Sequence, residues 1–268
     1  MIRALHARMP IQSHSAPFPR TGASKVPAVT VVFWIIKIAA TTLGETAGDA
    51  VSMTMNLGYA VGTLIFFIFF LVMVAAQVRA KAFHPFLYWA VIVGTTTVGT
   101  TMADFADRSM GIGYVGGSLM LFAMLMGVLG LWYYSLGSVS VNHITSHKAE
   151  IFYWMTILFS NTLGTALGDF LADESGLGYE GGALVFGAAL MLIAALYYFA
   201  RISHVALFWA AFILTRPLGA TLGDMLTKPH DHGGLNLSRI SSSAAIAVFM
   251  IACILLASRK PRTHPQSH

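Results

Sequence analysis

The chain has 268 residues and a formal net charge of +5 at pH 7, with histidine counted as neutral. Hydrophobic residues make up 56% of it and charged residues only 10%, whereas soluble domains carry about 25% charged residues. A chain this apolar would expose large apolar patches in water, so the composition excludes an ordinary soluble domain and predicts a helical membrane protein.

The first 26 residues carry arginine and histidine, contain no acidic residue and lack an apolar run. A cleavable secretory signal needs an apolar run, so this segment does not have the pattern of one. We expect residues 1–26 to form a basic, disordered cytoplasmic tail, and residues 259–268 to form a similar basic tail at the other end.

Residues 27–258 contain eight apolar runs, each close to the ~20 residues that a helix needs to cross the hydrocarbon core of a bilayer. In chain order the runs are 28–48, 60–78, 86–106, 115–135, 151–171, 180–200, 205–226 and 239–257. The strands of a β-barrel would be about half as long and would alternate apolar with polar residues, which these runs do not. We therefore predict an all-α polytopic membrane protein with eight transmembrane helices.

Most of the sixteen Lys and Arg residues lie in the two termini and in the loops after the second, fourth and sixth runs. The positive-inside rule then places both termini in the cytoplasm. Because this asymmetry accounts for most of the basic balance, we do not interpret the charge as a sign of nucleic-acid binding.

Four segments superimpose on one pattern without a gap: a Trp, a Gly ten residues later, an Asp five residues further and a Gly nine residues further. The copies are Trp34–Gly44–Asp49–Gly58, Trp89–Gly99–Asp104–Gly113, Trp154–Gly164–Asp169–Gly178 and Trp209–Gly219–Asp224–Gly233. A unit with an even number of spans repeats in the same orientation. We therefore predict four parallel two-helix repeats, at about 27–80, 82–136, 147–201 and 202–258, in a pseudo-symmetric bundle.

The charged residues inside the membrane fall in the odd-numbered spans, whereas the interiors of the even-numbered spans are apolar. Ionisable residues within membrane spans face the interior of a bundle. We therefore predict an inner ring of the four odd spans with the even spans nearer to lipid. We expect the repeated Gly residues to let the inner helices approach closely, and the repeated Trp residues to anchor the helices at the lipid headgroups.

Polar residues recur every fourth position along the odd spans, so they lie on one face of each helix at matching depths. The outermost level holds Asp49, Asp104, Asp169 and Asp224; the next holds Glu45, Thr100, Thr165 and Ala220; the third holds Thr41, Thr96, Asn161 and Arg216. Carboxylate, hydroxyl and amide oxygens are the ligands of hard cations such as Mg²⁺, Mn²⁺ and Ca²⁺. We predict a cation pathway with the four aspartates as candidate metal ligands. Its other members are Glu45, Thr41, Thr100, Thr165 and Asn161. The alternative is that the aspartates only stabilise the ends of their helices.

The first repeat alone carries Lys37 and Glu45 within its span, and the fourth alone carries Arg216. Glu45 and Arg216 differ by one helical turn in depth, so they form a buried ion pair if the first and seventh spans are adjacent. Our hypothesis is that this pair closes the pathway on the cytoplasmic side of the aspartates and that Lys37 repels cations further in. The alternative is a static salt bridge that fixes the order of the helices.

Further acidic residues flank the aspartates on the outer side. We expect Asp107, Asp173 and Glu174 to form an outer vestibule that draws cations toward the ring. The last outer loop holds His230, Asp231 and His232, which are too few ligands to predict a zinc site, and we expect this loop to be solvated.

The fourfold two-span repeat with its Trp, and the segments KIAATTLGETAGDA and NTLGTALGDF, resemble a family of bacterial integral membrane proteins that carry a repeat of unknown function. The resemblance covers residues 26 to about 258. It implies four tandem repeats and a bacterial inner-membrane location, but no established activity and no functional residue.

These features favour a membrane transporter or channel for a cation, either a divalent metal ion or a proton-coupled cation, with the lipid bilayer and the cation as partners. We expect no covalent cofactor, and a bound divalent cation would be a substrate. One alternative is a sensor or scaffold whose polar ring only directs assembly. The other is an intramembrane acid/base enzyme, but the Gly-x-Gly-Asp signature of intramembrane aspartyl proteases does not occur at any of the four aspartates.

Overall fold

The computed structural model describes residues 25–141, 144 and 146–259. Within these residues the chain is all-helical, with eight long α-helices and short π- and 3₁₀-helical turns. The long helices are α1 (Val31–Asp49), α2 (Gly58–Arg79), α3 (Pro85–Asp104), α4 (Tyr114–Leu136), α5 (His147–Asp169), α6 (Gly178–Phe199), α7 (His204–Thr227) and α8 (Arg239–Arg259). Each predicted span has its helix, so the prediction of an all-α, eight-helix bundle is confirmed. The predicted basic tails lie almost entirely outside the described residues.

The starts of the odd helices are set by local sequence signals. The hydroxyl oxygens of Thr30, Ser146 and Ser203 accept hydrogen bonds from backbone N–H groups in the first turns of α1, α5 and α7. Helix α3 instead begins at Pro85, whose fixed φ and missing N–H suit a first helical residue. The four inner helices therefore each begin shortly before the repeated Trp, at Val31, Pro85, His147 and His204.

Seven helices among the described residues are long and apolar enough to cross a membrane. The remaining helix, α5, has the length, at 23 residues, but not the apolar composition. The apolar windows of α2, α4, α6 and α8 are 11–33% buried, whereas those of α1, α3 and α7 are 67–72% buried. The chain is therefore a multi-pass membrane protein whose even helices present apolar side chains to lipid.

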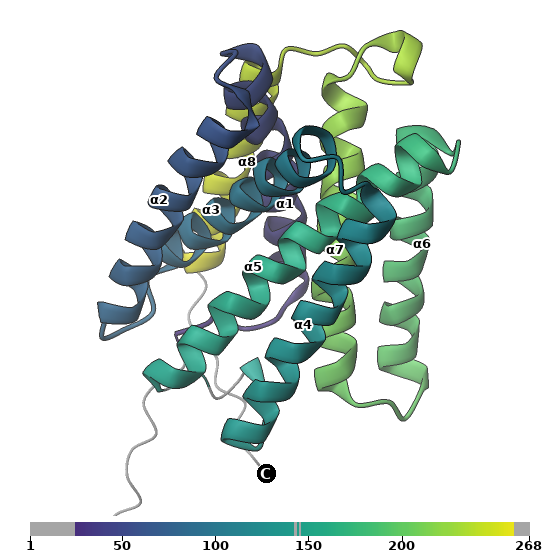
Figure 1. The fold of residues 1–268 in the computed structure, drawn as a ribbon. Helices are drawn as coiled ribbons and strands as arrows, with labels where there is room; N and C mark the ends of the chain where they lie inside the picture. The colour runs from purple at the N-terminus through teal and green to yellow at the C-terminus, as the bar shows by residue number, and fades with distance from the viewer. Residues whose placement is uncertain (1–24, 142–143, 145, 260–268) are drawn as a thin grey trace, which may run out of the picture.

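The odd helices form a closed inner ring in the order α1, α3, α5, α7, with α7 packed back against α1. Each even helix lies outside one member of the ring: α2 against α3, α4 against α5, α6 against α7 and α8 against α1 (Figure 1). The sequence predicts the inner ring of odd helices with the even helices outside it, because ionisable residues confined to the odd spans need a lipid-free interior. The order of the helices around the ring comes from the structure.

Repeated glycines let the four inner helices approach closely. Each repeated Gly faces a residue of the neighbouring inner helix that lies two helical turns after the repeated Trp of that helix. The pairs are Gly44 with Thr96, Gly99 with Asn161, Gly164 with Arg216 and Gly219 with Thr41. A Cβ atom on Gly164 would lie 2.5 Å from the Cβ of Arg216, so a larger residue does not fit there without moving a helix. The predicted packing role of these glycines is confirmed.

At the end of the ring opposite to the aspartates, aromatic residues form a closed belt between the helices. The ring centroids are 5.5 Å apart for Phe33–Trp89, 5.8 Å for Tyr88–Trp154, 6.3 Å for Tyr153–Trp209 and 5.7 Å for Trp34–Phe208. Trp89, Trp154 and Trp209 are 3–5% exposed. The prediction that the repeated Trp residues anchor the helices at the headgroups is therefore wrong for these three, because each packs against an aromatic residue of the preceding repeat.

The glycine contacts generate a test of the inner ring. We expect Gly164→Ala to destabilise the protein by about 1–3 kcal/mol, the usual cost of overpacking a tight interface. Gly127→Ala on α4 is the matched control, because no atom lies within 4 Å of a Cβ at that position. Thermal unfolding in detergent should show a lower Tm for Gly164→Ala only. Equal Tm values for the two variants would contradict this account of the packing.

Candidate functional site

The four repeated aspartates lie at the ends of α1, α3, α5 and α7 and are buried. Asp49 is 2% exposed, and Asp104, Asp169 and Asp224 are each 3% exposed. In the first three repeats the chain continues from the aspartate into a single π-helical turn: η1 (Ala50–Thr54), η2 (Phe105–Ser109) and η4 (Phe170–Glu174). In the fourth repeat α7 stays α-helical to Thr227. The structure thus brings the four carboxylates to one end of the inner ring.

Basic side chains bridge these aspartates in two pairs. Arg108 Nε lies 2.9 Å from Asp104 Oδ1, and its Nη2 lies 3.7 Å from Asp169 Oδ2. Lys228 Nζ lies 3.2 Å from both Asp49 Oδ2 and Asp224 Oδ1. The ring is therefore divided into two halves, each with two aspartates from adjacent helices and one shared cation.

A third basic residue contacts the ring from α8. Arg239 Nε lies 3.4 Å from Asp49 Oδ2, the same oxygen that Lys228 approaches. Burial disfavours the charged form of Lys228, but the carboxylates of Asp224 and Asp49 outweigh this effect and raise its pKa well above the usual value. The two carboxylates therefore favour the ammonium form of Lys228 at the aspartate end of the ring.

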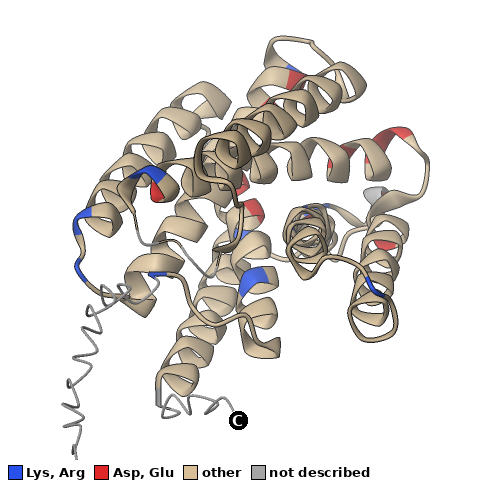
Figure 2. Cartoon of the chain, turned by 90° about the horizontal axis from the view of Figure 1, so that it is seen from below, with Lys and Arg blue, Asp and Glu red and all other residues tan. Residues whose placement is uncertain are grey.

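Arg108, Lys228 and Arg239 are not among the residues that the sequence pattern predicts for the site. A signal for two of them was present, because Arg108 and Lys228 each lie four residues after a ring aspartate, at the spacing that brings side chains together on a helix. The same position holds Met53 in the first repeat and Asp173 in the third. In the view along the bundle, Lys or Arg and Asp or Glu lie side by side near its centre (Figure 2).

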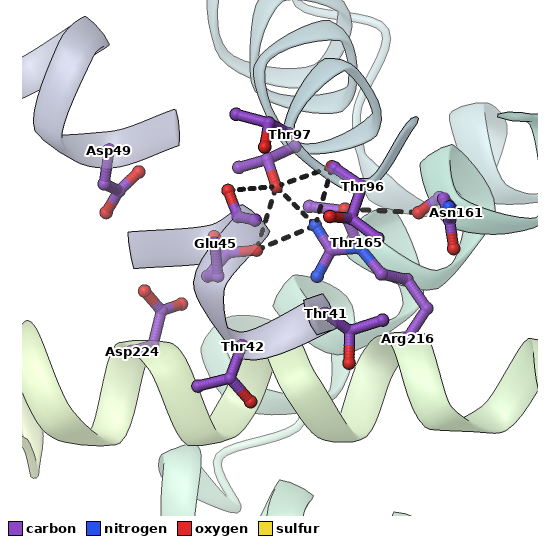
Figure 3. A network of polar contacts seen from close by, with 12 residues as sticks. Thr41, Thr42, Glu45, Asp49, Thr96, Thr97, Asn161, Thr165, Arg216 and Asp224 are labelled. Carbon is purple, nitrogen blue, oxygen red and sulfur yellow. Dashed lines mark hydrogen bonds and ion pairs between the residues drawn. The ribbon is translucent and has the colours of Figure 1, made fainter. Parts of the chain in front are cut away.

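One turn deeper, Glu45 and Arg216 are in contact. Arg216 Nη2 lies 3.0 Å from Glu45 Oε2 and also contacts the Thr100 hydroxyl (Figure 3). Thr100 Oγ1 in turn lies 3.2 Å from Glu45 Oε2, to which it donates a hydrogen bond. The network joins α1, α3 and α7, and both members of the ion pair are buried, at 3% exposure for Glu45 and 0% for Arg216.

The Glu45–Arg216 contact does not satisfy the whole guanidinium. Within the described part of the chain, Arg216 Nε and Nη1 have no hydrogen-bond partner. A buried ion pair without full hydrogen bonding contributes little net stability, whereas removing one partner is strongly destabilising. The contact therefore fixes the relation of α1 to α7 more than it stabilises the fold.

Three carboxylates of the site come close enough to share one ion. Oxygens of Glu45, Asp49 and Asp224 lie within 4.8 Å of one another, and all three residues are buried. This group contains only two of the four aspartates predicted as metal ligands, because Asp104 and Asp169 lie in the other half of the ring with Arg108. Oxygen-rich groups of this kind suit hard cations.

The other polar residues predicted along the pathway are engaged in helix contacts. Thr41 Oγ1 lies 2.8 Å from the Ile38 carbonyl oxygen, and Thr165 Oγ1 lies 3.3 Å from the Asn161 carbonyl oxygen. Asn161 Nδ2 donates to Thr95 Oγ1 across 2.8 Å. The Asn161–Thr95 bond joins α5 to α3, and Thr41 Oγ1 also lies 3.1 Å from the Thr215 carbonyl oxygen of α7. The Thr165 hydroxyl bonds only within α5 among the described residues.

Below this depth Lys37 lies among apolar side chains. Lys37 is fully buried, and its level is completed by Ile92, Ile157 and Phe212, which are also fully buried. Lys37 Nζ lies 4.2 Å from the centroid of the Phe212 ring, in the geometry of a cation–π contact, and has no hydrogen-bond partner among the described residues. The aromatic belt follows one turn further, so the polar path is closed at this end.

The three predicted vestibule residues take different positions. Asp173 is exposed, accepts hydrogen bonds from the hydroxyls of Tyr114 and Tyr179, each at 3.3 Å, and lies at the rim beside Arg108. Glu174 is also exposed. Asp107 instead is 9% exposed and packs against Gly117 of α4, where a Cβ atom would lie 2.7 Å from Asp107 Oδ1. Only two of the three therefore face the outer solvent.

Comparison with known proteins identifies the repeat itself. A family model described as Repeat of Unknown Function (DUF347) matches four tandem segments, at residues 32–83, 87–137, 152–203 and 207–263. No curated protein and no solved structure matches the chain. Each matched segment contains one odd helix of the ring and the even helix that follows it.

The buried ion pair can be tested by a double-mutant cycle. We expect Arg216→Met to destabilise the protein by about 3–5 kcal/mol, because it leaves the Glu45 carboxylate buried without its partner. Adding Glu45→Gln should recover most of this loss, since the remaining amide carries no charge. Denaturant unfolding of the purified protein measures both effects. A double variant that is no more stable than Arg216→Met would show that the two residues do not act as a pair.

Proposed function

The chain belongs to the family defined by this repeat of unknown function, and from the geometry of its core we propose that it is a membrane transporter or channel for a cation. We place it in a bacterial inner membrane with both termini in the cytoplasm, as the distribution of Lys and Arg among the loops indicates. The aspartate end of the inner ring then faces the outside of the cell.

The observation that carries this proposal is the burial of five carboxylates around one axis. Asp49, Asp104, Asp169, Asp224 and Glu45 are each no more than 3% exposed, although ionisable groups within membrane spans are costly and occur mainly on substrate or ion paths. Four of them come from equivalent positions of four repeats. A ring of carboxylates is also the arrangement by which many cation channels select positive charge.

The charge balance of the ring supports a cation rather than an anion. Among the described residues, four ring aspartates are contacted by three basic side chains, those of Arg108, Lys228 and Arg239. One negative charge remains, which a proton or another single positive charge would neutralise. If one basic side chain leaves, two negative charges remain, and these match a divalent metal ion.

The position of the apolar layers supports a gated pathway. Polar levels extend from the ring to Arg216, and the levels of Lys37 and of the aromatic belt close the axis beyond it. A path that is polar on one side and closed on the other corresponds to one state of a transporter or a gated channel. Movement of a cation across the membrane requires the inner helices to separate at the belt.

A second candidate is a sensor or scaffold in which the polar ring only directs assembly. The observation in its favour is that every ring aspartate has a basic neighbour, within 3.7 Å at most. Buried ion pairs of this kind can specify how helices are arranged without taking part in any reaction.

Ion flux into proteoliposomes separates the two candidates. We expect flux of one ion among Mg²⁺, Mn²⁺, Ca²⁺, Zn²⁺ and H⁺ in the wild-type protein, and its loss in Asp49→Asn and Asp169→Asn, which take one carboxylate from each half of the ring. Glu180→Gln is the matched control, because Glu180 is an exposed acidic residue at the same end of the bundle.

Two outcomes would count against the proposal. If correctly folded wild-type protein carries none of these ions, the ring does not serve their transport and the scaffold is favoured. If flux occurs but survives in both aspartate variants, the pathway does not pass through the ring.

A further inference from the structure

The connection after α7 differs from the outer connections of the other three repeats. In those repeats the chain passes from the ring aspartate through a π-helical turn to the next helix. After α7 it passes through Lys228, Pro229 and the 3₁₀ turn η5 (His230–His232) before α8 begins at Arg239. We call residues 228–239 the α7–α8 segment.

The backbone of this segment is folded back on the end of α7. Leu235 N donates to the Met225 carbonyl at 2.7 Å, and Leu237 N donates to the Leu226 carbonyl at 2.9 Å. Asn236 N donates to the carbonyl of Lys228 at 2.9 Å, and Gly234 packs so closely on that carbonyl that a Cβ atom would not fit. The segment is therefore anchored through its backbone and holds the backbone of Lys228 in place. His230 and Asp231 are exposed, as expected for a solvated loop.

The two basic ends of the segment meet at one carboxylate oxygen. Lys228 Nζ lies 3.2 Å and Arg239 Nε 3.4 Å from Asp49 Oδ2, and Lys228 also reaches Asp224 Oδ1 at 3.2 Å. The side chains of Lys228 and Arg239 are 11% and 21% exposed, whereas that of Asp49 is 3% exposed. The basic groups thus lie between these carboxylates and the outer solvent.

We propose that the α7–α8 segment is a built-in plug, whose basic ends occupy Asp49 and Asp224 and compete with a divalent cation for the same carboxylate oxygens. This inference rests on the proposed function, because it assigns a regulator to the half of the ring that contains the Glu45, Asp49 and Asp224 group. The ammonium group of Lys228 occupies the position in which a substrate cation would be bound.

The charges of the Glu45, Asp49 and Asp224 group explain why a divalent ion would replace the plug. With Lys228 in place, its single positive charge is shared by two carboxylates, and Glu45 is already paired with Arg216. When the ammonium leaves, only the Arg239 guanidinium remains, beside Asp49. When both basic groups withdraw, Asp49 and Asp224 carry two uncompensated charges, which a divalent ion neutralises with hard oxygen ligands. Lysine has a flexible four-carbon stem, so its ammonium group can withdraw while the anchored backbone stays in place.

Within the part of the chain that the structure describes, no such segment lies on the other half of the ring. There Arg108 bridges Asp104 and Asp169 from the π-helical turn of its own repeat. Its guanidinium is held by Asp173 as well, at 3.7 Å. The two halves are therefore equivalent in acidic residues but different in how their cation is held, and we assign divalent binding to the half with the lysine.

Binding of Mn²⁺ to the purified full-length protein tests the plug directly. We expect Lys228→Gln to bind Mn²⁺ at least tenfold more tightly than wild type, and Arg239→Gln to show a change in the same direction. Lys81→Gln is the matched control, since Lys81 is exposed at the other end of the bundle. Titration followed by the electron paramagnetic resonance signal of free Mn²⁺ measures the affinities without requiring transport.

A second measurement, the Tm with and without Mn²⁺, distinguishes removal of the plug from misfolding of the variant. Lys228→Gln leaves two adjacent aspartates without their ammonium partner, so its Tm should fall in metal-free buffer and recover on addition of Mn²⁺. Unchanged or weaker Mn²⁺ binding in both Lys228→Gln and Arg239→Gln, or a lowered Tm that Mn²⁺ does not restore, overturns the proposal.

The outcome also separates this inference from the proposed function. Tighter Mn²⁺ binding in the variants, with no ion flux in any form of the protein, would support the plug and reject transport. Flux that depends on the aspartates, with Mn²⁺ affinity unaffected by either substitution, would support transport and reject the plug.

Discussion

The cost of keeping carboxylates out of water is the constraint on which the structure of this protein depends. Five acidic side chains are buried at one end of a four-helix ring, and each lies beside a basic group supplied by another part of the chain or by the same helix. Such contacts form only if the inner helices are in the order α1, α3, α5, α7. The glycine contacts allow the same order, because they remove the side chains that would separate the helices. Charge compensation and close packing therefore select one arrangement together.

Divergence among the repeats converts a fourfold arrangement into two unequal halves. The aspartates, glycines and tryptophans occur in all four repeats, and they build the ring, the helix contacts and the belt. The position four residues after the aspartate is basic only in the second and fourth repeats, so each half of the ring receives one bridging cation. Glu45 and Arg216 occur once each and join the first repeat to the last. The repeated residues thus build the helix bundle, whereas the unrepeated residues place charged groups in particular repeats.

The chemistry also changes along the axis of the ring. Carboxylates and basic groups dominate the aspartate end, the Asn161 amide bonds across helices at the depth of Arg216, and apolar and aromatic side chains fill the opposite end. An anchored segment with two basic residues lies over one half of the outer end. A cation that enters would meet exchangeable partners first and a packed barrier last. This order of contacts agrees with a binding site that opens to one side at a time.

The membrane class, the eight helices, the four repeats and the relative depth of each polar residue can all be predicted from the amino-acid sequence. Helical periodicity and an ungapped repeat fix depth directly, and for this reason the pairing of Glu45 with Arg216 follows from the sequence once their two helices are taken as neighbours. The tertiary structure determines which basic residues reach the aspartates of other helices. The i,i+4 spacing in the sequence indicates only Arg108 with Asp104 and Lys228 with Asp224. The tertiary structure also decided that three tryptophans pack inside the belt and that the α7–α8 segment folds back on α7. Depth is a property of one helix, whereas these contacts depend on how neighbouring helices and their connections are placed around the ring.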